Sequence, residues 1–269
     1  LPNGLKIFIV PKPQHRKKYA FFATRYGGMD MQFIRNGEKY DTPAGIAHYL
    51  EHKMFDTKDG NALQVLSQNG AEPNAFTSNA MTGYYFDCTE HFEENLRILL
   101  SFVSVPYFTD ESVEKERGII GQEIRMVEDS PDWQVYERLL ACLYRSSPAR
   151  VPIAGTVESI AELTPQMLYS CTKAFYAPSN MVLSVAGKIT LAQAVDACKR
   201  NGLYRARAPH EVEWAIPAQS GPLPHREAVF TMPVTKPCFG VAYREEPLAE
   251  GDIKRELLLD MLGDLVVGG

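Results

Sequence analysis

Segments with strand and helix patterns are grouped along this 269-residue chain, and this grouping limits the fold more than any other feature. The first residues hold two strand-forming segments, 5–10 and 17–26, which end at turns containing proline or glycine. Most of segment 43–176 has the spacing of amphipathic helices, interrupted by an aromatic strand pattern at 75–89. A further strand pattern follows at 180–188. This order predicts an α+β fold in which an antiparallel sheet packs against helices on one side.

A proline-rich stretch, which includes GPLPH (221–225), separates the last part of the chain from the rest. It predicts one full domain over residues 1–205, a linker over 206–228 and the beginning of a second domain over 229–269. About 40 residues rarely support a core alone, so we expect that last part to be truncated. Within it, the patterns predict two strands and one helix, in the segments REAVFTMP (226–233), CFGVAYRE (238–245) and GDIKRELLLDMLGDLV (251–266).

Charge and cysteine usage exclude several classes of function. The formal net charge of −5 provides no basic surface for nucleic acid or anionic lipid. No apolar run approaches the roughly 18 residues that a membrane span needs. The five cysteines are odd in number and widely spaced, which argues against a disulfide framework and against a cysteine zinc site. We therefore expect a cytoplasmic protein with neither a nucleic acid nor a membrane as partner.

The segment GIAHYLEHKMF (45–55) has two histidines and a glutamate on one predicted helix, with Thr42 as its expected cap. Each helical residue advances by about 100°, so His48 and His52 lie about 40° apart and their rings can converge on one ion. Neutral imidazole suits zinc, and Glu51 projects near the same face without being a ligand. The alternative interpretation is a solvated, charged helix face.

The order His-x-x-Glu-His is that of the inverzincin peptidases. Zinc lowers the pKa of a bound water toward about 7, and an adjacent carboxylate such as Glu51 can then accept its proton. A catalytic zinc usually has three protein ligands, so one more must come from elsewhere in the chain.

The best candidate for this ligand lies in VEKERGIIGQEI (113–124), where Glu116 and Glu123 are about 20° apart on a predicted helix. Glu123 stands among isoleucines and is expected to turn inward, where a carboxylate is costly without a metal or a cation. Glu116 is placed to hydrogen-bond a ligand histidine and fix its tautomer. A solvated charged helix is again the alternative.

Five motifs, in order along the chain, resemble those of the insulinase/pitrilysin family of zinc metallopeptidases. The resemblance runs from Leu1 to about residue 200. Within the family, the chain is similar to the bacterial branch, which is akin to the mitochondrial processing peptidase β subunit. It implies that residues 1–205 form a zinc-binding catalytic domain of the half-clamshell type, followed by the start of a second, similar domain. The motifs are AHYLEHKMF, GAEPNAFTS, VEKERGIIGQEI, PIAGTVESI and FYAPSNMVLSVAG.

The same resemblance assigns roles to the residues identified above. It implies His48, His52 and Glu123 as zinc ligands, Glu51 as the general base that activates a zinc-bound water, and Glu116 as a supporting catalytic carboxylate. The spacing between His52 and Glu123 is slightly shorter than is usual in the family. The surrounding sequence ERGIIGQE nevertheless makes Glu123 the matching position.

The family's Asn-Ala-x-Thr segment matches residues 74–77. It implies that Asn74, Ala75 and Phe76 lie on an edge strand that binds an extended peptide through main-chain hydrogen bonds. For Asn74 the alternative is a turn residue after Pro73. The resemblance also implies a second domain or a homologous subunit that closes a chamber around the substrate.

We therefore predict a zinc-dependent metalloendopeptidase that hydrolyses short, unfolded peptides. The alternative is a non-catalytic or regulatory partner subunit of a heterodimeric peptidase, and a purely regulatory metal-binding module is a third interpretation. The presence of the two histidines, the base and the third ligand favours the enzyme. Trp133 and Trp214 are expected to be packing residues.

Overall fold

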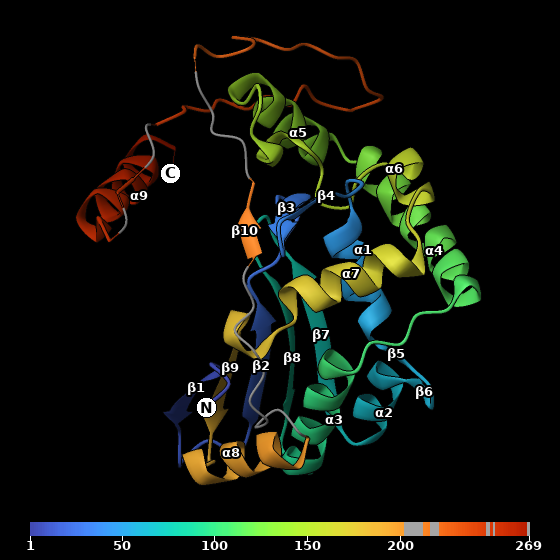
Figure 1. Cartoon of the computed structure of the whole chain (residues 1–269). Helices are drawn as coiled ribbons and strands as arrows, with labels where there is room; N and C mark the ends of the chain where they lie inside the picture. Colours follow the sequence, from blue (N-terminus) through green and yellow to red (C-terminus); the bar gives the residue numbers. More distant parts are fainter. Residues whose placement is uncertain (202–211, 216–220, 246–247, 250, 268–269) are drawn as a thin grey trace.

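A five-stranded sheet forms the centre of the computed structural model, which describes residues 1–201, 212–215, 221–245, 248–249 and 251–267 (Figure 1). Its strand order is β1-β9-β2-β8-β7. The strands are β1 (Lys6–Pro11), β2 (Lys18–Thr24), β7 (Ala71–Thr77), β8 (Thr82–Cys88) and β9 (Met181–Gly187). Neighbouring strands are antiparallel except β1 and β9, because β9 inserts between β1 and β2 and runs opposite to β2. The predicted α+β class is confirmed, with one parallel pair in the sheet.

Two smaller sheets accompany the central one. The first has the order β10-β3-β4 and the second pairs β5 with β6. These strands are β3 (Gln32–Arg35), β4 (Glu38–Asp41), β5 (Asp56–Thr57), β6 (Gly60–Asn61) and β10 (Val212–Trp214). The hairpin between β3 and β4 was not predicted. It turns at Asn36 and Gly37, which have φ values of 53° and 78° in the left-handed region that asparagine and glycine tolerate best.

The described helices account for about half of the described residues outside the strands, and two short 3₁₀ turns lie at Pro148–Arg150 and Pro178–Asn180. The helices are α1 (Ile46–Met54), α2 (Ala62–Gln68), α3 (Phe92–Ser104), α4 (Asp110–Glu128), α5 (Pro131–Leu143), α6 (Val157–Ala161), α7 (Pro165–Phe175), α8 (Leu191–Arg200) and α9 (Ile253–Val267). No helix in the described part of the chain is both long and apolar enough to cross a bilayer.

Helix α1 begins later than predicted, and the expected cap at Thr42 is wrong. The N-cap is Gly45, which has a φ of 90°, while the Thr42 hydroxyl donates to the Met31 carbonyl at 2.8 Å. A β-carbon on Gly45 would lie 2.4 Å from the Ala154 carbonyl oxygen. Glycine is therefore needed both for the left-handed turn and for the close approach of the segment before α6.

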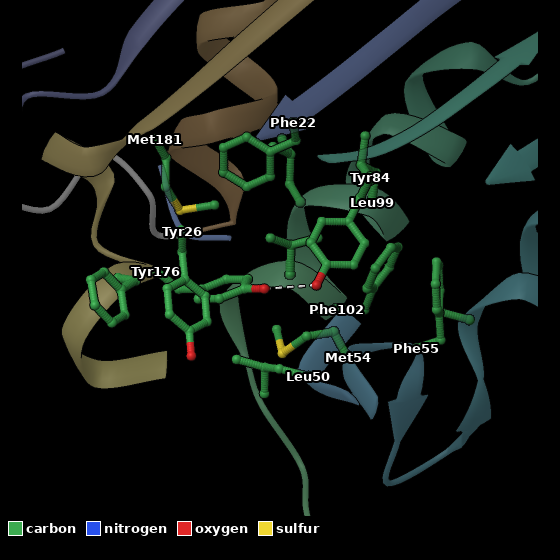
Figure 2. Close-up of a cluster of buried hydrophobic side chains, with 14 of the residues drawn as sticks. Phe22, Tyr26, Leu50, Met54, Phe55, Tyr84, Leu99, Phe102, Tyr176 and Met181 are labelled. Carbon is green, nitrogen blue, oxygen red and sulfur yellow. Dashed lines mark hydrogen bonds between the residues drawn. The ribbon is translucent and has the colours of Figure 1, made fainter. Parts of the chain in front are cut away.

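The core lies between the sheet and the helices that cover one of its faces. On β9 buried and half-buried residues alternate, as expected for a strand with only one fully covered face. Figure 2 shows Leu50 and Met54 of α1 in this core beside Tyr84, whose hydroxyl is 2.8 Å from that of Tyr176. Because α1 buries this apolar side, its histidines are turned toward α4.

The two strands predicted within 226–245 are wrong: among the described residues 221–245 the structure contains no strand. These residues form the extended orange-red segment beyond α5 in Figure 1. A segment with alternating apolar and polar residues becomes a strand only if a neighbouring strand forms hydrogen bonds with its backbone. Residues 221–245 contact helix α5 instead. The Arg138 guanidinium lies 4.2 Å from the centroid of the Phe230 ring, and Arg244 donates to the Leu143 carbonyl at 2.8 Å.

The predicted helix at the end of the chain is confirmed by α9. The predicted linker, 206–228, contains β10 and lies partly outside the described residues. The division of the chain at 205 and 228 stays a prediction.

Candidate metal centre

Helices α1 and α4 bring His48, His52 and Glu123 together, as the sequence predicted. The Nε2 atom of His48 lies 3.4 Å from one Glu123 carboxylate oxygen, and the Nε2 atom of His52 lies 3.5 Å from the other. One ligand atom from each of the three residues can be chosen so that all lie within 4.8 Å of one another. The two imidazole rings meet edge to face, with their centroids 4.7 Å apart.

These distances fit a zinc ion. A tetrahedral zinc with bonds of about 2.0–2.1 Å places neighbouring ligand atoms about 3.3 Å apart. The two nitrogen-to-oxygen distances, 3.4 and 3.5 Å, are close to that value. Two imidazoles and one carboxylate are also a donor set that leaves a fourth position open in catalytic zinc sites.

Glu116 lies about two helical turns before Glu123 on α4 and contacts the ring nitrogen of His52 that faces away from Glu123. Its Oε1 atom is 3.0 Å from Nδ1 of His52. That contact favours a proton on Nδ1 and leaves Nε2 free to coordinate an ion. The Nδ1 atom of His48 is buried and has no hydrogen-bond partner among the described residues.

Two side chains of α1 hold the helix against the first turn of α4. The Tyr49 hydroxyl donates to the Val113 carbonyl, and the Lys53 ammonium donates to the Ser112 carbonyl at 3.1 Å. Lys53 is fully buried and also forms an ion pair with Asp56. These contacts set the spacing of α1 and α4, on which the convergence of the histidines with Glu123 depends.

Glu51 lies beside the three convergent residues and is buried. Its Oε2 atom accepts a hydrogen bond from the Thr77 hydroxyl at 2.5 Å. Burial raises the pKa of the Glu51 carboxyl, although the Thr77 hydrogen bond and the nearby His48 and His52 partly oppose the shift. A carboxylate with a raised pKa is better suited to accept a proton near neutral pH.

The charges of the site also shift the pKa values of two predicted ligands. Burial opposes the charged form of His52, but the hydrogen bond with Glu116 and the surrounding carboxylates outweigh burial and raise the pKa of the ring. The hydrogen bond with His48 lowers the pKa of Glu123 despite partial burial. Without an ion, the surroundings therefore favour the charged forms of His52 and Glu123.

The predicted substrate strand is an edge strand, because β7 is the last strand of the central sheet. Asn74 and Phe76 are exposed on it, and Ala75 is half-buried. The Ala75 N–H is 2.8 Å from the Asn74 side-chain oxygen, its neighbour in sequence. Asn74 lies within β7 and not in a turn, so its alternative as a turn residue after Pro73 is wrong.

A cavity of about 230 Å³ extends from the candidate metal centre along α5. His48 and Thr77 line one end, and Trp133, Tyr136 and Ile153 contribute to the rest of its wall. The expectation that Trp133 is a packing residue is wrong, because half of its surface is exposed. Its ring meets that of Tyr136 edge to face at 5.8 Å. Trp133 and Tyr136 are three residues apart on α5, and this spacing on one helix face is the sequence pattern from which the cavity wall could have been predicted.

The expectation for Trp214 holds. Its partly buried ring packs against the core, 6.3 Å from the ring of Phe175, and the Arg25 guanidinium lies 4.4 Å from its centroid.

Comparison with protein families agrees with this geometry. A family model described as Insulinase (Peptidase family M16) matches residues 32–157, which contain all the predicted ligands. A model described as Peptidase M16 inactive domain matches residues 162–269. The chain belongs to the insulinase family, peptidase family M16. The resemblance inferred from the five sequence motifs is therefore confirmed.

Individual M16 relatives are similar over the same region. The Uncharacterized zinc protease YmfH of Bacillus subtilis (strain 168) is 48% identical over 191 residues, which cover 70% of this chain and 45% of that protein. The Mitochondrial-processing peptidase subunit beta of Caenorhabditis elegans is 31% identical over 165 residues, which cover 58% of this chain and 36% of that protein. This chain thus spans less than half the length of either relative.

The crystal structure of an M16-like peptidase from Alicyclobacillus acidocaldarius is 40% identical in sequence. It matches with a TM-score of 0.78 over 82% of this chain and 52% of that chain. The fold is therefore that of an M16 peptidase domain. The names of the relatives and the donor set agree on zinc as the metal that this site fits.

Proposed function

We propose that this chain is the metal-binding part of a zinc metalloendopeptidase that hydrolyses short, unfolded peptides. The convergence of His48, His52 and Glu123, with the buried Glu51 beside them, is the observation that supports this function best. His48, His52 and Glu123 would hold the ion, and Glu116 would orient His52. When bound, zinc supplies a Lewis acid that lowers the pKa of water and polarises a carbonyl.

Glu51 acts as the base in this proposal. Its Oε2 atom is engaged by Thr77, so its Oε1 atom accepts a proton from the attacking water as the new C–O bond forms. The same carboxyl then returns that proton to the amine nitrogen as the C–N bond breaks. Burial supports both steps, because the raised pKa of Glu51 brings proton uptake and proton release closer in free energy.

The substrate would bind as an added strand. An extended peptide can form main-chain hydrogen bonds with the free edge of β7, at Asn74, Ala75 and Phe76, whatever its sequence. A folded protein presents few free extended segments, so this mode of binding selects unfolded peptides. A second domain or a homologous subunit would close the chamber over this edge. We also propose a cytoplasmic location, which is supported by the five free thiols of the chain.

A non-catalytic or regulatory partner subunit is the second candidate function. The match of residues 162–269 to a model described as an inactive domain favours it. The predicted ligands and base all lie outside that match, within the residues matched by the other M16 model. The two candidates therefore differ in whether Glu51 supports turnover.

The test measures zinc content and peptide cleavage together, in this chain and in any longer polypeptide that contains it. Glu51→Gln should keep one zinc per chain and lose cleavage of a fluorogenic unfolded peptide, whereas His52→Ala should lose both. Glu114→Gln, at an exposed position on α4, is the matched control and should change neither. Cleavage by Glu51→Gln at the normal rate, or full zinc content in His52→Ala, would contradict the assignment.

A further inference from the structure

We propose that Thr77 is a positioning residue that fixes one oxygen of the Glu51 carboxylate and so ties the base to the strand expected to bind the substrate. The proposal rests on the proposed function. It concerns a contact between elements that are distant in sequence, since Thr77 ends β7 and Glu51 lies on α1.

The contact itself is short and partly shielded from water. The Thr77 hydroxyl donates to Oε2 of Glu51 at 2.5 Å, and only 8% of the Glu51 residue is exposed. A carboxylate that accepts one hydrogen bond of this length cannot rotate without losing it. Thr77 therefore selects Oε2 as the anchored oxygen and leaves Oε1 for the reacting proton.

The direction of this hydrogen bond follows from its neighbours. Among the described residues, the only other side-chain oxygen within hydrogen-bond distance of the Thr77 hydroxyl is that of Thr82, at 3.5 Å. Thr82 directs its single hydroxyl proton to the Tyr26 carbonyl at 2.8 Å. An ionised carboxylate can only accept and the contact with Thr82 is long, so the single proton of the Thr77 hydroxyl goes to Glu51.

The backbone that carries Thr77 is held from the other side by the loop after β2. The Gly28 N–H donates to the Ser78 carbonyl at 2.9 Å, and the Met29 N–H donates to the Asn79 carbonyl at 2.9 Å. Gly27 approaches the same turn so closely that a β-carbon there would lie 2.4 Å from the Ser78 carbonyl oxygen. Thr77 therefore cannot follow Glu51 if the carboxylate turns, and it acts as a fixed point.

Thr77 also continues the predicted substrate strand. It is the residue directly after Phe76 in β7, and it lines the cavity together with His48 and Glu123. A peptide added to this edge would be aligned with the same strand that holds the base. The expected effect of losing the hydroxyl is therefore on turnover, while peptide binding by the strand edge remains.

The test compares two substitutions at this position. Thr77→Val removes the hydroxyl with little change in shape, and Thr77→Ser keeps it. We expect Thr77→Val to lower kcat by about 10-fold or more, the usual effect of removing an orienting partner. Its KM and zinc content should stay as in the wild type, and Thr77→Ser should restore most of the turnover. Thr57→Val is the matched control and should leave kcat unchanged, because among the described residues the Thr57 hydroxyl forms hydrogen bonds with Asp59 and Gly60 of the β5–β6 ribbon alone.

A second readout does not depend on activity. Crystal structures of the zinc-free chain should show one Glu51 orientation in the wild type and in Thr77→Ser, and a turned carboxylate in Thr77→Val. An unchanged Glu51 orientation in Thr77→Val, or a wild-type kcat in that variant, would overturn the proposal. Equal loss of kcat and of thermal stability in both Thr77 variants would also overturn it, because that result indicates packing alone. If the wild type cleaves no peptide, the proposed function fails and the crystal structures still decide the role of Thr77.

Discussion

Replacing the buried Asp30 by asparagine should abolish a pH dependence of folding stability that the wild-type chain shows between about pH 4 and 6. Only 3% of Asp30 is exposed, and its carboxylate accepts the Gly27 N–H at 2.8 Å. Burial raises the pKa of Asp30 from 3.8 to about 6, although the Gly27 hydrogen bond, the Arg25 charge and the Trp214 side chain oppose the shift. A shift of about two pKa units corresponds to about 3 kcal/mol.

The sign follows from which state binds the proton more tightly. The folded state has the higher pKa, so the protonated carboxyl contributes its stability fully below about pH 4. This contribution is lost as the pH rises through about 6, and the charged form then destabilises the folded state by up to about 3 kcal/mol. Asparagine does not titrate, so the stability difference between wild type and Asp30→Asn should slope across this window. In Asp30→Asn the amide N–H₂ can face the Trp214 N–H, and two donors form no hydrogen bond with each other. At neutral pH the substitution should therefore raise the unfolding free energy by less than about 3 kcal/mol.

Guanidinium chloride unfolding at several pH values between 4 and 8 measures this difference. The quantity to plot is the unfolding free energy of Asp30→Asn minus that of the wild type, because other carboxylates titrate equally in both proteins. Asp59→Asn, at an exposed position, is the matched control and should give a flat difference. The reasoning would be refuted if the difference between Asp30→Asn and the wild type were also flat across this range. It would equally be refuted if the wild type became more stable relative to Asp30→Asn from pH 4 to 6.

Three further predictions concern the elements around the site. Lys53→Met should lower the unfolding free energy by about 1–2 kcal/mol, because it leaves the half-exposed Asp56 without its partner, and should weaken zinc binding about 10-fold in chelator competition. Gly27→Ala should destabilise the chain by about 1–3 kcal/mol, measured by denaturant unfolding, because its β-carbon collides with the backbone of the β7–β8 turn. Zinc at about 100 times its Kd should raise the unfolding free energy by about 2.7 kcal/mol in Glu51→Gln but not in His52→Ala.

Local patterns predicted the elements whose burial follows a regular period. The 3.6-residue spacing placed His48 and His52 on one face of α1, and Glu116 and Glu123 on one face of α4, as the structure has them. The hairpin of β3 and β4 was missed although Asn36–Gly37 is a strong turn signal, because its strands are short and mostly polar.

The wrong predictions concern segments whose structure depends on tertiary contacts and not on the local sequence pattern. Thr42 and Pro43 resemble a helix start, but Thr42 bonds to Met31 and the close approach of the segment before α6 makes Gly45 the cap. The alternation within 226–245 is typical of strands, yet the described residues give it no ladder. The role of Thr77 could not be predicted either, since its contact with Glu51 depends on how β7 packs against α1.

Helix α1 explains why the site depends on so many contacts at once. Seven of its nine residues are directed at four different neighbours. Leu50 and Met54 face the core, and His48 and His52 face the predicted ion. Tyr49 and Lys53 contact α4, and Glu51 contacts β7. A rotation of the helix by one residue, about 100°, would exchange the roles of all these faces. The apolar face therefore determines the direction of the histidines, and the contacts of Tyr49 and Lys53 determine their distance from Glu123. Substitutions in the core face should for this reason change zinc affinity as well as stability, even though they contact no ligand atom.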